Sequence, residues 1–99
     1  MWLVHGYFDD SWINWQGLLL RLQSGRLLVH YLWLKLLDIS VEDIQFAERV
    51  QFHRWFPTAA IRIHYADANV TRTVTLGLLF GTRREKLLHL LEEAGVTIR

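Results

Sequence analysis

The sequence predicts a small, mainly β domain that ends in one α-helix. Through most of residues 17–80, apolar and polar side chains alternate with a period of two, which is typical of strands with one buried face. Near the C-terminus the apolar spacing changes to that of one helical face. The chain has 99 residues and no visible repeat or linker, so we expect a single domain over residues 1–99.

A hairpin is predicted around the turn Ser24-Gly25, because glycine adopts a positive φ without steric cost. This turn joins two predicted strands, residues 17–23 and 26–31. The register about the turn gives three cross-strand pairs on one face: Leu22 with Leu27, Leu20 with Val29, and Leu18 with Tyr31. Because pattern and register agree, this face is expected to belong to the core.

A second hairpin is predicted around Trp55-Phe56-Pro57-Thr58, and the turn Asp67-Ala68-Asn69 adds a third strand, residues 70–80. On its first strand, residues 44–54, one parity is apolar and is expected to face the core: Ile44, Phe46, Val50 and Phe52. The register about the first turn pairs Phe52 with Ile61 and Val50 with Ile63. Threonines alternate with the apolar residues of the third strand and are expected to face solvent.

Residues 2–8 and 32–39 are predicted to be two further strands, with residues 9–15 as a turn or loop. Ser40 is expected to cap one helical turn that leads into the strand at Ile44.

The final helix is predicted to run from residue 83 to residue 94. Thr82 and Glu85 have the spacing of a capping box at its start. Gly95 is placed to adopt a left-handed conformation at its end, and Val96 to pack back onto the last turn. One face of this helix is apolar: Leu87, Leu90, Leu91 and Ala94.

The order of these elements resembles the bacterial pleckstrin-homology-like domains. Four segments carry the resemblance: Ser24-Gly25-Arg26-Leu27-Leu28-Val29, Ile39-Ser40-Val41-Glu42-Asp43-Ile44, Ile61-Arg62-Ile63-His64-Tyr65 and Arg83-Arg84-Glu85-Lys86-Leu87-Leu88. The resemblance implies a bent antiparallel barrel of about seven strands capped by the helix, and a self-associating scaffold or binding module that is not an enzyme. Eukaryotic members that bind phosphoinositides carry a basic cluster in the first interstrand loop. Here the candidate loops, residues 9–11 and 23–26, hold two acids and a single Arg, so inositol-phosphate binding is not implied.

Composition excludes several classes of function. The chain has no cysteine, which excludes disulfides, thiolate chemistry and cysteine-based zinc sites. The net charge of +1 produces no strong field for nucleic acid, and no nucleic-acid partner is expected. No apolar run approaches the roughly 20 residues that span a bilayer. Since the N-terminus also lacks the pattern of a signal peptide, we expect a cytoplasmic protein.

No catalytic, metal or cofactor site is predicted. The five histidines do not have the spacing of metal ligands, and neighbouring acids on a strand point to opposite faces. Arg83 and Arg84, with the backbone N–H groups of the first helical turn, are candidates for binding an anion. The alternative is a solvated helix end whose charges have partners within the molecule.

Excess apolar surface is the main indication of function. Residues 17–37 carry leucines on the second face of the predicted strands as well: Leu19, Leu28, Leu32 and Leu36. A strand that is apolar on both faces needs cover on both, and one helix is too small to supply it. Either residues 1–15, which include Trp12 and Trp15, fold over this face, or a partner covers it.

The leading hypothesis is therefore a non-catalytic interaction module that buries these leucines, with Trp12 and Trp15 as anchors, by protein association and chiefly by self-association. The alternative is a peripheral membrane-surface binder that uses the N-terminal aromatic residues and nearby basic residues. A third reading, an enzyme or carrier that uses a barrel interior, lacks convergent polar groups.

Overall fold

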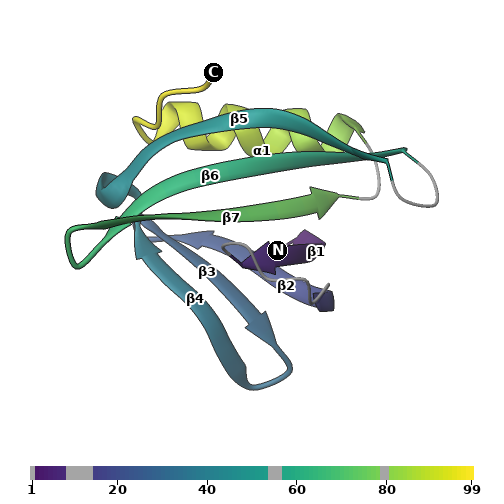
Figure 1. Cartoon of the computed structure of the whole chain (residues 1–99), viewed down its shortest axis with the longest axis horizontal. Coiled ribbons are helices and arrows are strands. Elements are labelled where there is room, and N and C mark those ends of the chain that lie inside the picture. Colours follow the sequence, from purple (N-terminus) through teal and green to yellow (C-terminus); the bar gives the residue numbers. More distant parts are fainter. Residues whose placement is uncertain (1, 9–14, 54–56, 79–80) are drawn as a thin grey trace.

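The computed structural model describes residues 2–8, 15–53, 57–78 and 81–99, and the side chains of residues 18–51, 59–78 and 83–99 (Figure 1). Strands account for most of these residues, and one α-helix follows them, as predicted. The elements are β1 (Trp2–Phe8), β2 (Trp15–Gln23), β3 (Arg26–Tyr31), β4 (Leu34–Ser40), the 3-10 turn η1 (Val41–Asp43), β5 (Ile44–His53), β6 (Pro57–Asp67), β7 (Val70–Leu78) and α1 (Gly81–Glu93). Trp12 and the rest of residues 9–14 lie outside the described residues.

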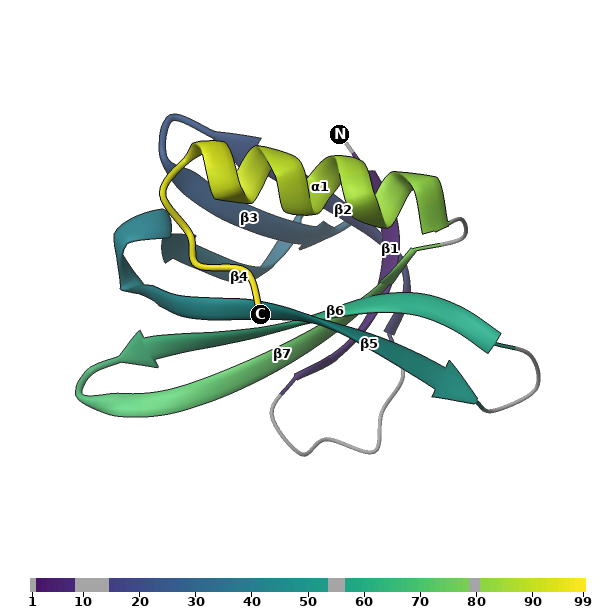
Figure 2. The same cartoon turned by 90° about the horizontal axis from the view of Figure 1, so that it is seen from above.

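The strands form one antiparallel sheet in the order β4-β3-β2-β1-β7-β6-β5. The sheet bends so that β2–β4 and β5–β7 lie in two layers (Figures 1 and 2). The edge strands β4 and β5 do not pair with each other over the described residues, so the expected barrel is not closed. The outer edge of β5 is instead occupied by the C-terminal segment, because the Ala47 N–H donates to Thr97 O at 2.9 Å and the Arg99 N–H donates to Ala47 O at 2.8 Å.

The core lies between the two layers and beneath α1, which packs chiefly on β6 and β7 (Figure 2). Its largest fully buried side chains are Leu18, Leu20, Leu27, Val29, Ile61, Ile63, Val74, Leu76, Leu78, Leu87, Leu88 and Leu91. Thr75, expected at the solvent face, is buried and accepts a hydrogen bond from Arg62 Nε at 3.4 Å. The predicted alternation is confirmed for the inner face of β2 and β3, whereas residues 74–78 of β7 are all buried.

The first hairpin has the predicted register. Leu22 pairs with Leu27 and Leu20 with Val29. Tyr31, predicted to pair with Leu18 on the core face, is instead 39% exposed and pairs with Leu34. Both turn residues have a positive φ, 53° at Ser24 and 72° at Gly25, as a two-residue hairpin turn of type I′ requires. The cap before η1 is also confirmed, because Ser40 Oγ accepts a hydrogen bond from the Glu42 N–H at 3.3 Å.

The second hairpin has a different register from the predicted one. Val50 pairs with Ala60, and Ile61 and Ile63 pair with Arg49 and Ala47. The register is displaced by three residues, and an odd displacement exchanges the two faces of a strand. Ala47 is therefore buried, whereas Phe46 and Val50, expected in the core, are only half-buried. Phe52 pairs with Thr58 instead of Ile61, and its side chain lies outside the described residues. A bulge between Ile44 and Phe46 lets Ile44 still face the core.

The end of α1 is as predicted, but its start is not. Gly95 has φ 101°, the Val96 N–H donates to Leu91 O at 2.9 Å and the Gly95 N–H donates to Glu92 O at 3.0 Å. These two bonds define a Schellman motif. At the start, the helix already includes Gly81, and the carboxylate of Glu85 binds Arg49 of β5. Glu85 thus has a tertiary partner, whereas the side chain of Thr82, the other residue of the predicted capping box, lies outside the described residues.

The predicted strand over residues 32–39 was wrong at its beginning. Leu32 and Trp33 form a tight turn, and β4 begins at Leu34, which pairs with Tyr31. Further along, Leu36 has no partner in the register between Val29–Leu37 and His30–Lys35, so it forms a β-bulge.

Candidate functional site at the tip of the β3–β4 hairpin

Four consecutive large apolar residues occupy the end of the β3–β4 hairpin. Their exposed fractions are 39% for Tyr31, 65% for Leu32, 89% for Trp33 and 50% for Leu34. The hairpin projects away from the β5–β7 layer (Figure 1). Two other large apolar side chains in the described part of the chain are similarly exposed, Val70 and Leu90, and each lies in a different element. We call residues 31–34 the hairpin tip.

The backbone of the hairpin tip is strained at Leu32. This residue has φ 54°, and it alone of the two central turn residues has a positive φ. A positive φ at the first central residue only is the pattern of a type II′ turn, which normally has glycine there. A positive φ costs a residue with a Cβ about 1–2 kcal/mol. Since Leu32 is largely exposed, burial within this chain offsets little of that cost.

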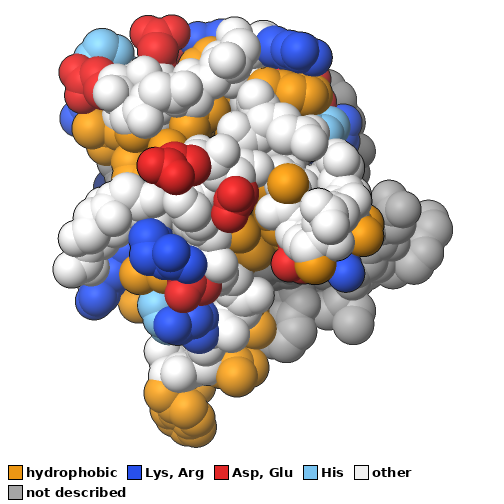
Figure 3. Space-filling model, turned by 90° about the vertical axis from the view of Figure 1, so that its left-hand side faces the viewer, with side chains coloured by type: hydrophobic (Ala, Val, Ile, Leu, Met, Phe, Trp, Pro, Cys, Tyr) orange, Lys and Arg blue, Asp and Glu red, His pale blue; other side chains and the backbone are white. Residues whose placement is uncertain are grey.

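Basic side chains lie on the outer face of β2–β4 next to the tip. The register aligns Arg21 with Leu28 and Asp38, and His30 with Lys35, on the face opposite the core. Arg26 lies on the same face, at the far end of the hairpin. We call this outer surface, with its basic residues Arg21, Arg26 and Lys35, the cationic face. Its single carboxylate, Asp38, leaves a net charge of +2 with His30 neutral. Figure 3 shows basic side chains just above the apolar end of the molecule.

Asp38 is held by two of these cations. Its carboxylate accepts a hydrogen bond from Arg26 Nε at 2.7 Å and one from Lys35 Nζ at 3.3 Å. The hydrogen bond from Arg26 holds the pKa of Asp38 below its usual value, and Lys35 adds to this effect. Because Asp38 stays ionised, it compensates one of the three cations and leaves the other two to act on the surroundings.

Of the four leucines predicted to form one outer face, two lie on it. Leu19 and Leu28 are on the outer face and half-buried, between cross-strand neighbours that are mostly polar or charged. Leu32 is in the turn, and Leu36 packs against the core because of the bulge. Trp15 begins β2, and its side chain, like Trp12, lies outside the described part of the structure. Among the residues whose side chains are described, the largest group of exposed apolar side chains is therefore at the tip.

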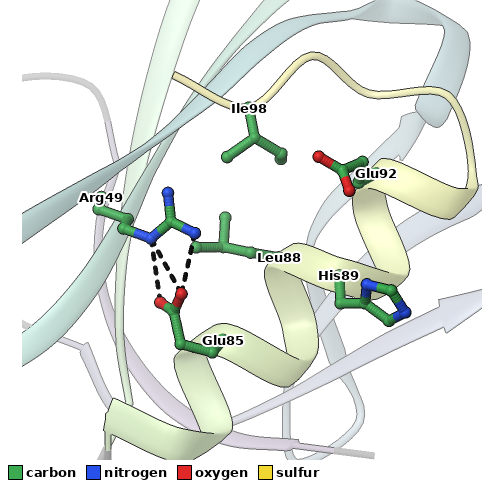
Figure 4. Close-up of a pocket in the computed structure, with 6 residues that line it drawn as sticks. All are labelled: Arg49, Glu85, Leu88, His89, Glu92 and Ile98. Carbon is green, nitrogen blue, oxygen red and sulfur yellow. Dashed lines mark hydrogen bonds and ion pairs between the residues drawn. The ribbon is translucent and has the colours of Figure 1, made fainter.

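A hollow of about 190 Å³ lies between β5, α1 and the C-terminal segment (Figure 4). Arg49 crosses it and donates to Glu85 from Nη2 at 2.8 Å and from Nε at 3.0 and 3.1 Å. These bonds lower the pKa of Glu85 and raise that of Arg49. The rim also holds two carboxylates, and the cation is already paired, so this hollow is an interface between elements rather than an anion site.

The proposed anion-binding residues lie at the start of α1. Arg84 donates to Glu85 Oε2 at 3.2 Å and to Val50 O at 3.3 Å, and Arg83 is exposed. The contacts of Arg84 match the alternative of partners within the molecule, and anion binding stays a prediction. Among the residues whose side chains are described, no group of three or more His, Asp or Glu is arranged to hold a metal ion.

The outer face of β5–β6 carries a second polar cluster. The rings of Phe46 and His64 stack at 4.1 Å, and Arg99 lies 4.0 Å from the centre of the Phe46 ring. Glu48 Oε1 lies 3.1 Å from His64 Nε2 and 3.7 Å from Arg62 Nη1. These contacts hold the C-terminus on β5 and satisfy one another, which indicates a structural role.

Comparison of the chain with protein-family models, with curated proteins and with solved structures finds no match. Within the described residues, no helix has the length and apolar character needed to cross a membrane. The hairpin tip is therefore interpreted from its own chemistry. The sequence signal that points to it is the run Tyr31-Leu32-Trp33-Leu34, since one buried strand face cannot accommodate four large apolar side chains in a row.

Proposed function

We propose that this protein is a non-catalytic interaction module, built on a pleckstrin-homology-like framework, that binds its partner through the hairpin tip. The observation that carries the proposal is the 89% exposure of Trp33 at the end of a projecting hairpin. Soluble proteins expose clustered large apolar residues chiefly where they bind something else. Seven strands followed by one helix, in the order expected from the resemblance, support the framework.

Protein association, most simply with a second copy of the chain, is the first form of this function. Edge-to-edge pairing of two β4 strands is disfavoured, because β4 carries the bulge at Leu36 and the charged residues Lys35 and Asp38. Self-association would therefore use the side chains of the hairpin tip, with Trp33 as the main anchor, since Trp dominates interface energetics.

Sedimentation velocity from low to high micromolar concentration tests this form. If the tip self-associates, the wild type forms a concentration-dependent dimer, Trp33→Ser remains monomeric, and Val70→Ser behaves like the wild type. Val70 is a suitable control, because it is 54% exposed at the start of β7, outside the tip. A wild type that is monomeric throughout, or a Trp33→Ser variant that still dimerises, would remove self-association through the tip.

Binding to a membrane surface is the second candidate form. The observation that favours it is the cationic face directly behind the tip. In this form the binding residues are those of the β3–β4 hairpin rather than the N-terminal aromatic residues on which the sequence-based alternative relied.

A further inference from the structure

We infer that the hairpin tip inserts into the headgroup region of an anionic lipid bilayer, with the cationic face directed at the lipid phosphates. This inference rests on the proposed function, in which the tip is the binding element. Three properties of the hairpin favour a bilayer over a second copy of the chain: the area of the tip, its charge environment and its shape.

The area of the tip is too small for a stable protein dimer. If a large apolar side chain offers roughly 200 Å², the exposed fractions of residues 31–34 correspond to roughly 500 Å² of surface in total. A specific protein interface buries about 800 Å² on each partner. The remaining area would have to come from the flanks of the hairpin, and these carry charge.

The charge environment favours an anionic surface. Lys35 directly follows the tip, and its side chain is 54% exposed. Arg21 pairs with Leu28, four residues before Leu32, which places it about 13 Å behind the turn by the rise of a strand. A symmetric dimer that buried the flanks would bring two faces of net charge +2 together. The same cations attract an anionic bilayer over a distance of about 10 Å.

The shape of the tip suits a fluid surface. A two-residue turn that carries Leu32 and Trp33 is narrow and convex, so a protein partner would need a matching pocket, whereas a bilayer deforms around it. Trp and Tyr favour the headgroup level of membranes, and Leu side chains favour the acyl boundary below it. Glycine would relieve the strain at position 32. The presence of leucine there is explained if binding needs an apolar side chain at the end of the hairpin.

Co-sedimentation with vesicles tests the inference on the full chain. The probes are vesicles of phosphatidylcholine alone and of phosphatidylcholine with phosphatidylserine. The wild type should bind the anionic vesicles, bind the neutral ones much more weakly, and lose affinity as salt is raised. Trp33→Ser should lower the affinity for anionic vesicles at least about tenfold. Lys35→Gln should lower it about fivefold.

Two matched variants serve as controls. Val70→Ser removes an exposed apolar residue from the other hairpin, and Lys86→Gln removes an exposed cation from α1, on the far side of the molecule from the tip (Figure 1). Both should bind vesicles like the wild type. Equal losses in a control and in the matching tip variant would overturn the inference, because the binding would then not depend on the hairpin.

The outcomes also separate this inference from the proposed function. If vesicles are not bound but a tip-dependent dimer forms in sedimentation velocity, the bilayer inference is refuted and the interaction module stands. If neither vesicles nor a second copy depends on Trp33, both are refuted. Circular dichroism of each variant confirms that the fold is retained, and Trp33→Leu, which keeps an apolar tip, should recover most of the vesicle binding lost in Trp33→Ser.

Discussion

The left-handed conformation of Leu32 makes a quantitative prediction about stability. Replacement by alanine or by glycine removes the same exposed side chain, so the two variants differ mainly in backbone energetics. Alanine retains the left-handed cost of about 1–2 kcal/mol, and glycine avoids it. Glycine loses about 0.5–1 kcal/mol more conformational entropy on folding. Leu32→Gly should therefore be more stable than Leu32→Ala by about 0.7 kcal/mol.

Thermal unfolding followed by circular dichroism measures this difference. For a domain of this size it corresponds to a Tm higher by about 3–6 °C in Leu32→Gly than in Leu32→Ala. Leu34, which has no positive φ and begins β4, provides the matched control. At that position alanine should be the more stable by about 0.5–1 kcal/mol. An equal or lower Tm for Leu32→Gly than for Leu32→Ala would refute the strained turn.

The same pair of variants links stability to binding. Leu32→Gly keeps the hairpin and relieves its strain, yet it removes an apolar side chain from the tip. If the tip is the binding element, this variant should gain stability relative to Leu32→Ala without gaining affinity for anionic vesicles. A variant that gains stability without gaining affinity is expected where a strained residue is retained for function.

Two further predictions concern the core and the ion pairs. Leu91→Ala should lower the free energy of unfolding, measured in urea, by about 2–5 kcal/mol, because Leu91 is fully buried. Leu90 is one residue away but 39% exposed, so Leu90→Ala should lower it by less than about 1 kcal/mol. Similar losses in the two variants would contradict the packing of α1. Arg49 lowers the pKa of Glu85 in the folded protein. The ionised carboxylate therefore stabilises the fold at pH values above the ordinary carboxyl pKa. This stabilisation is lost as the pH falls from about 5 through the folded-state pKa. The urea midpoint should therefore fall less steeply with acid in Glu85→Gln than in the wild type, and an identical acid dependence would refute this assignment.

Features determined over a short stretch of chain were predictable from the sequence. The Ser24-Gly25 turn sets its own hairpin register, because two positive φ values and a two-residue loop leave one pairing. The end of α1 at Gly95 and the cap at Ser40 likewise depend on backbone groups a few residues apart. The mainly β class with one terminal helix followed from periodicity alone.

Features that depend on distant partners were decided only by the tertiary structure. The predicted register of β5 on β6 was wrong by three residues. No glycine marks the turn between these strands, and the alternation on β5 does not reveal which set of alternate residues is buried. The bidentate contact between Glu85 and Arg49, 36 residues apart, could likewise not be read from the local spacing that suggested a capping box.

The candidate site divides in the same way. The sequence alone determined that residues 17–37 contain more large apolar side chains than one buried face can hold. Where the excess lies was decided by a tight turn at Leu32 and a bulge at Leu36, which direct one leucine outward and the other against the core. Both irregularities change which way a strand faces, and their energies depend on packing against the rest of the sheet, so a pattern of residue types does not specify them.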